Sequence, residues 1–379
     1  MAGLLIYADT LRSPEMRHEV PIGIPDPFLY AERNRERHAV VSSFEIDRIA
    51  AVASEMELIP PEELGLDELY AQGLEREEIE LELALRATRR FGIERASVPS
   101  TFPVGLADHL RAHGIEITSD RDLFTARRRV KNESELAGIR RAQRAAEDAM
   151  SAARELLRVA ERKNGTVVLD GEPLTCERLK VAVEQAFIAN GAFADEFIVS
   201  HGPQTAVGHD MGSGPIAPGE TVVVDLWPKD RESACFADMT RTFVVGDPPD
   251  EIVQWHGLVL EALERSLKAT KAGVSGRAVY DVSCEVFEAE GHPTQRTKEK
   301  GKSLAEGFFH ALGHGVGLEV HEEPIMGKIE GYELLAGDVV TLEPGLYRQG
   351  FGGVRLEDLV LVTEDGAENL TDFPYDLAP

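Results

Sequence analysis

Short runs of apolar, often β-branched residues alternate with amphipathic stretches over the first 130 residues of the chain. Five short runs have the composition of strands: 4–8, 26–32, 38–43, 96–99 and 115–117. Three longer stretches repeat apolar positions every three or four residues, as amphipathic helices do: 45–55, 75–91 and 106–113. Strands that alternate with helices predict an α/β arrangement around a mixed sheet.

A basic segment at 127–131 separates this pattern from a second one and is the predicted domain boundary. A long amphipathic helix follows it to about residue 163, and Asn132 or Ser134 is its predicted N-cap. Three further stretches have helical periodicity: 174–190, 249–272 and 276–291. The sequence therefore predicts two domains, residues 1–130 and 131–379, which agrees with the usual domain size for a chain of this length.

The second domain contains one strand pattern twice. Residues 219–225 and 337–343 each run from a glycine through valines to a carboxylate six residues later, Asp225 in the first and Glu343 in the second. Each is followed by a return strand that also begins on a carboxylate: Asp238 and Glu357. Two antiparallel hairpins, with acids facing one another across each ladder, predict the two halves of a pseudo-twofold sheet. One pair of helices accompanies each hairpin.

Acidic residues outnumber basic ones, 67 to 40, and the formal net charge is −27. This charge argues against nucleic acid and anionic membranes as partners, because both are bound through lysine and arginine. The first residues lack the basic start and long apolar core of a signal peptide, and no run reaches the ~20 apolar residues of a membrane helix. The three cysteines are isolated, without metal-binding or disulfide spacing. We expect a cytoplasmic protein.

Three of the eleven histidines lie within twelve residues, in the stretch 307–324. His310 and His314 are four residues apart, which is the spacing of a metal-binding pair on a helix. Glycines at 313, 315 and 317 disfavour that helix by about 1 kcal/mol each, so the stretch is predicted as a glycine-rich loop or strand. From this stretch alone, ordinary histidines in a turn are as good an interpretation as a metal site.

The carboxylates at the ends of the four strands favour the metal site. A single acid at a strand end commonly faces solvent, but four acids at matching places beside a histidine cluster would converge. Two like charges roughly 4 Å apart repel by about 4 kcal/mol at an effective dielectric constant near 20, so converging carboxylates must take up protons or hold cations. Two divalent ions would balance four charges, and oxygen ligands with one imidazole suit manganese-like or cobalt-like ions. Such a pair of ions points to hydrolysis.

Five motifs in this order resemble the metallopeptidases of the creatinase and methionine-aminopeptidase superfamily: Val224-Asp225, 238–243, 308–317 with His321, 342–347 and 354–358. The resemblance is closest to the Xaa-Pro branch, prolidase and aminopeptidase P, and covers the whole chain. It implies the α+β fold class, with a creatinase-like N-terminal domain of mixed sheet and helices. It also implies a C-terminal pita-bread domain with a pseudo-twofold antiparallel sheet.

The resemblance further implies two divalent metal ions per chain and a role for each ligand. Asp225 would chelate one ion, His314 and Glu343 would hold the other, and Asp238 and Glu357 would bridge both. Glu343 would also serve as the base that handles the proton of the nucleophile. Manganese is the expected metal, with cobalt, zinc and iron as alternatives.

Five further residues match positions on the substrate side of the family site. His310 and His321 correspond to histidines that stabilise the tetrahedral intermediate or shuttle protons, and His209 resembles a further histidine of this kind. His209 and His310 would also contact substrate. Arg355 corresponds to an arginine that orients the bridging glutamate or contacts substrate, and Tyr347 to a tyrosine that lines the pocket.

The implied function is di-metal-dependent hydrolysis of the peptide bond between an N-terminal residue and proline, by an Xaa-Pro aminopeptidase or an Xaa-Pro dipeptidase. Substrates would be peptides with proline at the second position, and the family implies a homodimer. Two alternatives are a non-catalytic pita-bread binding module and a creatinase-like hydrolase of non-peptide C–N bonds. Both typically lack ligand carboxylates, whereas this chain keeps all five ligands. Residues 226–233 and 291–302 depart from the family pattern, the first as a longer hairpin and the second as a polar insertion.

Overall fold

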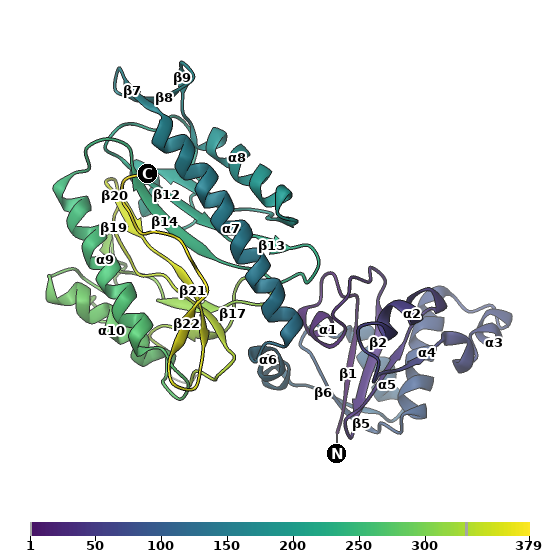
Figure 1. Ribbon diagram of the computed structural model, residues 1–379. Coiled ribbons are helices and arrows are strands. Elements are labelled where there is room, and N and C mark those ends of the chain that lie inside the picture. Colours follow the sequence, from purple (N-terminus) through teal and green to yellow (C-terminus); the bar gives the residue numbers. More distant parts are fainter. Residues whose placement is uncertain (1, 330–332) are drawn as a thin grey trace. The chain divides into compact units, whose positions relative to one another are not determined.

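The computed structural model describes residues 2–329 and 333–379, and the chain folds into two compact units. The first unit extends through Arg128, and the second runs from Arg129 to Pro379 (Figure 1). Each unit has its own sheets and its own buried apolar clusters, so each is described by itself.

The first unit is built on a six-stranded mixed sheet in the order β4-β3-β2-β1-β5-β6. Its strands are β1 Gly3–Ala8, β2 Phe28–Arg33, β3 Glu36–Val40, β4 Glu57–Ile59, β5 Arg95–Val98 and β6 Glu116–Ser119. Its helices are α1 Pro14–Glu19, α2 Ser43–Ala50, α3 Leu66–Ala71, α4 Arg76–Arg90, α5 Val104–Ala112 and α6 Arg121–Arg129. The central strand β1 is antiparallel to β2 and parallel to β5, which confirms the mixed sheet that the sequence predicted.

Apolar side chains of β1 alternate between the two faces of this sheet. Leu5 packs with residues of α4 and α5, whereas Leu4 and Ile6 pack with residues of α1 and α2. Both faces are therefore covered by helices, and this is why β1 reads as a continuous apolar run rather than an alternating one.

Four long helices surround the sheets of the second unit: α7 Glu133–Val159, α8 Cys176–Ala189, α9 Asp250–Ala269 and α10 Gly276–Ala289. Of the two predicted N-caps, Asn132 is the one used, because its side chain accepts a hydrogen bond from the Glu135 backbone N–H in a capping box. The helix ends at Val159, earlier than predicted, since residues 161–173 form a small sheet of β7 Glu161–Lys163, β8 Thr166–Leu169 and β9 Glu172–Pro173. Even the longest helices in the described part of the chain lack an apolar stretch that would span a bilayer.

Two antiparallel hairpins form the centre of the second unit. The first pairs β12 (Thr221–Leu226) with β14 (Met239–Val244), and β11 (Ile198–His201) lies on the other side of β12. The second pairs β18 (Val339–Leu342) with β21 (Asp358–Val362). The sheet of this second hairpin also contains β16 Gly313–Gly315, β17 Glu322–Met326 and β22 Ala367–Asn369. A backbone bridge between Thr240 and Glu357 joins the two hairpins where their acids lie.

Each hairpin packs against its own pair of helices (Figure 1). Residues of α7 and α8 share one apolar cluster with β12 and β14, and residues of α9 and α10 share another with β18 and β21. The duplication that the sequence predicted is therefore present in the packing as well as in the strand order.

The longer turn of the first hairpin is fixed by contacts outside the hairpin. Residues 226–233 contain β13 (Lys229–Asp230), which pairs with β10 (Ala192–Phe193). The Arg141 guanidinium of α7 donates to both carboxylate oxygens of Asp230, at 3.1 and 2.8 Å. The other departure, 291–302, contacts the histidine stretch, since Gln295 Nε2 donates to the Phe309 carbonyl at 2.8 Å.

Candidate metal centre

A cavity of about 700 Å³ opens in the second unit at the acidic ends of the two hairpins. Nine of the ten residues singled out from the sequence line it: His209, Asp225, Asp238, His310, His314, His321, Glu343, Arg355 and Glu357. Apolar side chains complete the described lining, among them Trp227, Phe309 and Ile325. The tenth residue, Tyr347 of β19 (Gly345–Arg348), is buried behind this lining.

Strand register brings the four carboxylates of the hairpins together. In the second hairpin, the ladder ends where Leu342 pairs with Asp358, so Glu343 and Glu357 lie opposite one another one residue beyond its end. In the first hairpin, Asp225 pairs with Thr240 rather than with Asp238. Asp238 is two residues from Thr240, so it lies diagonally across from Asp225 on the same face. The prediction that the acids lie opposite one another was wrong in register for this hairpin, but both acids reach the cavity.

Three side chains offer ligand atoms in a group small enough for one ion. Asp238, His314 and Glu357 each place one such atom within 4.8 Å of the others, and all three residues are buried. His314 Nε2 also lies 3.8 Å from Asp238 Oδ2 and 3.7 Å from Glu343 Oε1. The other His314 nitrogen, Nδ1, lies 3.1 Å from the Gly315 carbonyl oxygen. A donor hydrogen on Nδ1 therefore leaves Nε2 with a lone pair directed at the acids.

Burial and mutual repulsion raise the proton affinity of these carboxylates. Burial raises the pKa of Asp238 well above its ordinary value, and the neighbouring Glu357 raises it further. Burial and the charge of Glu357 likewise raise the pKa of Glu343. The pKa of Glu357 is raised to about 8, first by burial and then by Asp225. Burial lowers the pKa of His314 to about 4, so its imidazole is neutral at neutral pH.

One guanidinium balances part of this negative charge. Arg355, at the end of β20 (Gly352–Arg355), donates a short hydrogen bond to Asp225 Oδ2 and is the only arginine or lysine in the described cavity lining. Its Nη1 also donates to the Tyr347 hydroxyl at 3.2 Å, and that hydroxyl lies 2.9 Å from His310 Nε2. His310 Nδ1 lies 2.7 Å from the Ala311 carbonyl oxygen. Burial and the charge of Arg355 lower the pKa of His310 to about 3.

Two histidines lie at the exposed side of the cavity. His321 precedes β17, and its ring is 4.3 Å from the ring of His314, centroid to centroid, in an edge-on arrangement. His209 lies in the loop between β11 and β12 and is exposed. Both line the cavity.

Comparisons with known proteins give this site a family. Residues 137–364 match the model of metallopeptidase family M24, which is more than half of the chain. The chain belongs to metallopeptidase family M24. The Xaa-Pro dipeptidase of Pyrococcus horikoshii is 30% identical over 285 residues, 74% of each chain. That of Pyrococcus furiosus is 36% identical over 192 residues, which cover 50% of this chain and 51% of the relative.

Solved structures of similar proteins have the same fold along the whole chain. The prolidase of Pyrococcus horikoshii has a TM-score of 0.75 at 26% identity and covers 100% of this chain and 95% of its own. The X-Pro aminopeptidase of Thermotoga maritima has a TM-score of 0.79 at 23% identity and covers 100% of this chain and 97% of its own. The resemblance drawn from the motifs and the α+β pita-bread fold class are both confirmed.

The residues present fit the divalent metal that an M24 metallopeptidase requires. Asp238 Oδ1 is buried and has no hydrogen-bond partner among the described residues, although it is a strong acceptor. Four carboxylates and one imidazole with a free lone pair, with no thiol in the described lining, form an oxygen-rich donor set, which suits hard or borderline divalent ions. A cation in this place would satisfy the orphaned oxygen and replace the protons that the raised pKa values otherwise hold there.

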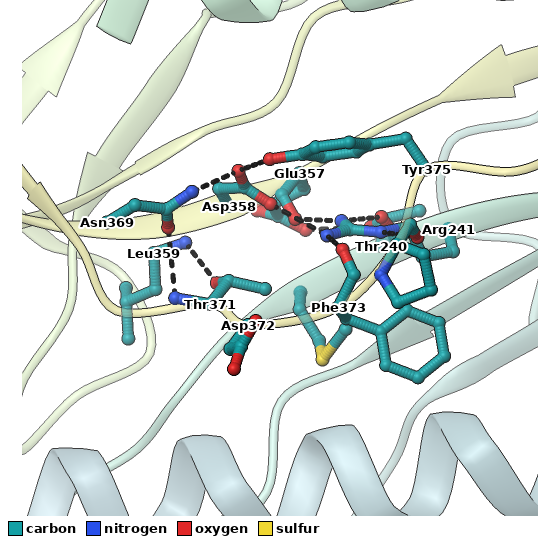
Figure 2. A network of polar contacts seen from close by, with 12 residues as sticks. Thr240, Arg241, Glu357, Asp358, Leu359, Asn369, Thr371, Asp372, Phe373 and Tyr375 are labelled. Carbon is teal, nitrogen blue, oxygen red and sulfur yellow. Dashed lines mark hydrogen bonds and ion pairs between the residues drawn. The ribbon is translucent and has the colours of Figure 1, made fainter.

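Sequence reasoning overlooked the residues that support the acids from behind. Thr240 Oγ1 donates to Glu357 Oε2 at 2.7 Å, and Arg241 pairs with Asp358 at 2.9 Å in the interior of the unit (Figure 2). A signal was present in the sequence, because Arg241 is a long charged residue in the middle of a β-branched strand. Apart from the neighbouring Thr240 carbonyl, however, its partners lie more than a hundred residues away along the chain.

The raised pKa of Glu357 predicts how the metal-free protein responds to pH. The unfolded chain loses this proton near pH 4.5 and the folded protein near pH 8, so the stability that the proton contributes is present at low pH and is lost as the pH rises to about 8. Between about pH 6.5 and 8, the buried histidines of the folded protein are neutral. Over this range the free energy of unfolding should fall by an amount on the order of 2 kcal/mol. Urea unfolding in excess chelator measures it.

Two comparisons check the origin of this pH dependence. The Glu357→Gln variant, which carries no titrating group at this position, should have a shallower slope than the parent. Added divalent metal should also reduce the slope, because it replaces the proton. A parent slope that is flat or rises with pH would contradict the raised pKa.

Proposed function

We propose that this protein is a di-metal-dependent peptidase that cleaves the bond between an N-terminal residue and proline. The observation that carries the proposal is the group formed by Asp238, His314 and Glu357 in the lining of the cavity, with ligand atoms within 4.8 Å of one another. The family membership supports metallopeptidase chemistry, and the Xaa-Pro dipeptidases among its relatives support the proline specificity.

The five ligands divide between two ions in this proposal. Asp225 would hold one ion, His314 and Glu343 would hold the other, and Asp238 and Glu357 would be shared between the two. The bridging roles agree with the positions of Asp238 and Glu357 at the junction of the two hairpins, beside the Thr240–Glu357 backbone bridge. When bound, divalent ions supply a Lewis acid for the scissile carbonyl and make water acidic enough to act as a nucleophile near neutral pH. Manganese is the proposed metal, since oxygen donors dominate the set.

The remaining polar residues handle protons and orient the substrate. Glu343 has a raised pKa and accepts the proton of the nucleophile. His321, at the open side of the cavity and beside His314, relays a proton to the leaving imino group, accepting one at one ring nitrogen as the other donates. His310 is held in one orientation by Tyr347 and the Ala311 carbonyl, so it presents a fixed ring edge to the substrate. His209 lies where it can contact the substrate, and a direct substrate contact of Tyr347 stays a prediction because this residue is buried.

The apolar part of the lining suits the proline side of the substrate. Proline has no N–H to donate and a rigid ring, so recognition depends on shape and apolar contact rather than on backbone hydrogen bonds. Trp227, Phe309 and Ile325 supply such contacts in the described lining. Trp227 belongs to the longer turn of the first hairpin, which is held by Asp230 and Arg141 and so places the indole firmly.

The direct test is an assay with matched peptides. Manganese-loaded protein should release the first residue from an Xaa-Pro dipeptide, an Xaa-Pro-Xaa tripeptide or both, and not from the Xaa-Ala counterparts. The ratio of the two rates assigns the dipeptidase or aminopeptidase branch. Absence of release from every Xaa-Pro peptide, with metal bound, would favour a binding module or a hydrolase of non-peptide C–N bonds.

His321→Ala should lower turnover by about 10²- to 10⁴-fold, the usual contribution of a general acid or base, while the bound metal stays the same. The metal content is measured by elemental analysis of the purified variant, and turnover with an Xaa-Pro peptide. His201→Ala is the matched control, because His201 pairs with Glu220 at 2.8 Å outside the described lining and should leave turnover nearly unchanged. An equal loss of metal and turnover in His321→Ala would make His321 a ligand instead.

We also propose that the protein acts as a homodimer in the cytoplasm. The three cysteines are unpaired and buried, as in proteins of reducing compartments. The family resemblance supports the homodimer. Light scattering after size-exclusion chromatography would report a single chain mass if the dimer proposal is wrong.

A further inference from the structure

Arg241 is a buried arginine of the metal-binding unit with a full set of hydrogen bonds, and it is not part of the described cavity lining. It lies in β14, three residues after Asp238, and its side chain is 1% exposed. A guanidinium has five N–H donors, and all five have acceptors here. Nη1 donates to the carbonyls of Thr240 and Glu357 at 2.9 and 2.7 Å, Nη2 to Asp358 Oδ1 and the Phe373 carbonyl, both at 2.9 Å, and Nε to the Pro374 carbonyl at 3.0 Å.

Two of these hydrogen bonds connect the backbones of the two hairpins next to the acidic residues. Thr240 and Glu357 face one another in the backbone bridge between the hairpins, and one Arg241 nitrogen binds both of their carbonyls. On the cavity side, the Thr240 hydroxyl donates to the Glu357 carboxylate at 2.7 Å. Glu357 is therefore fixed twice by the same strand, at its backbone by Arg241 and at its side chain by Thr240.

The other bonds attach a later segment of the chain to the same point. Figure 2 shows Arg241 and Asp358 surrounded by Asn369, Phe373 and Tyr375. Asp358 Oδ2 accepts from Asn369 Nδ2 at 2.7 Å and from the Tyr375 hydroxyl at 2.5 Å. The Tyr375 ring also lies 4.5 Å from the guanidinium carbon of Arg241, which adds a cation–π contact. Residues 369–375 thus complete the hydrogen bonds of a charge pair that has no access to solvent.

We propose that Arg241, Asp358 and residues 369–375 form a positioning network that sets the Glu357 carboxylate for metal binding. The inference rests on the proposed role of Glu357 as a metal ligand. Arg241 and Asp358 act through Glu357 and touch neither metal nor substrate. Some residues orient a metal ligand without touching the metal themselves. Replacing such a residue commonly weakens metal binding by roughly 10- to 100-fold.

A second buried pair in the same unit provides the contrast. Arg129 donates to both oxygens of Asp338, at 3.1 and 2.6 Å, and the Asp338 side chain is fully buried. That pair lies at the beginning of β18, with the four strand residues Val339–Leu342 between Asp338 and Glu343, and Arg129 binds Asp338 and the Glu333 carbonyl rather than a backbone carbonyl of a proposed ligand. Removing either arginine leaves a buried aspartate unpaired, so both changes should destabilise the fold, but only the loss of Arg241 should disturb Glu357.

The experiment compares metal affinity with stability in four variants of the full chain. Arg241→Met and Arg129→Met each remove one buried guanidinium, Arg241→Lys keeps the charge with fewer donors, and Arg241→Met with Asp358→Asn removes both charges together. Calorimetric titration with cobalt(II) gives the affinity, the visible absorption of bound cobalt(II) reports the ligand geometry, and thermal unfolding in chelator gives the metal-free stability. Arg241→Met should lower cobalt affinity roughly 10- to 100-fold and change the spectrum.

The controls separate positioning from folding. Arg129→Met should lower the metal-free melting temperature and keep cobalt affinity and spectrum within about threefold of the parent. The double variant should regain much of the melting temperature lost in Arg241→Met, but not the cobalt affinity. Arg241→Lys should have a cobalt affinity between those of Arg241→Met and the parent, since a lysine cannot bind both backbone carbonyls and Asp358 together. Parental affinity and spectrum in Arg241→Met, with only the melting temperature lowered, would overturn the proposal.

One more variant distinguishes failure of this inference from failure of the proposed function. If Glu357→Gln also binds cobalt with parental affinity, Glu357 is not a ligand and the assignment of the metal site itself is wrong. If Glu357→Gln loses affinity while Arg241→Met does not, the metal site stands and the positioning network alone is rejected.

Discussion

Asp238→Asn is expected to lower the bound divalent metal below the two ions per chain proposed for the parent and to reduce turnover by more than about a hundredfold. Asn has the same shape but no charge, and it replaces the acid that lies in the group with His314 and Glu357. Outer-shell changes already cost roughly 10- to 100-fold in metal affinity or activity, so the loss of a bridging ligand should exceed that range. Elemental analysis and turnover of an Xaa-Pro peptide measure the two quantities.

Asp230→Asn is the control, because it removes a buried carboxylate that is not a proposed metal ligand. Asp230 is buried in the same unit and paired with Arg141, but it lies outside the described lining of the cavity. Its variant should lose stability and keep its metal. If Asp238→Asn retained the full metal content of the parent, the bridging assignment of Asp238 would be wrong.

Arg355→Met should destabilise the metal-free protein by about 3–5 kcal/mol. In the described part of the chain, the change removes the only positive charge paired with buried Asp225, which is one of the four clustered carboxylates. Divalent metal should restore much of this loss, since it supplies the missing positive charge. Turnover of the metal-loaded variant should still fall, because Tyr347 loses its donor and no longer holds His310 in place. Urea unfolding with chelator and with manganese measures the first two effects.

Arg140→Met is a suitable reference for stability. Arg140 pairs with Glu368 at 2.9 Å through one nitrogen, and the two side chains are 41% and 48% exposed, so the expected cost is below about 1 kcal/mol. If Arg355→Met were no more costly than this exposed pair in chelator, Asp225 would not depend on Arg355 for its charge balance.

The sequence was informative where the pattern was long or repeated. The helices α7, α9 and α10 have enough turns for their apolar periodicity to be visible in the sequence. The two hairpins were predicted from their matching glycines and acids. The short elements α1 and β4, with six and three residues, contain too few positions to show any period.

The sequence predicted which residues form the site better than it predicted how they are arranged. The types and strand positions of the acids were readable, but the register of Asp225 against Thr240 depends on the turn at 226–233, which is fixed by β10 and α7. The support behind Glu357 depends on partners from residues 369–375, and no local pattern in β14 indicates which distant segment completes the hydrogen bonds of Arg241. Such contacts are set by tertiary packing rather than by local preference.

The bridge between Thr240 and Glu357 also has a consequence for folding kinetics. The ligands from Asp225 to Glu357 span more than a hundred residues, and the hairpins that carry them must dock before any complete site exists. Contacts of such long range form late, because loop closure must occur first. Metal should therefore slow unfolding and leave the rate of refolding almost unchanged, and its uptake during refolding should coincide with the docking of the two halves.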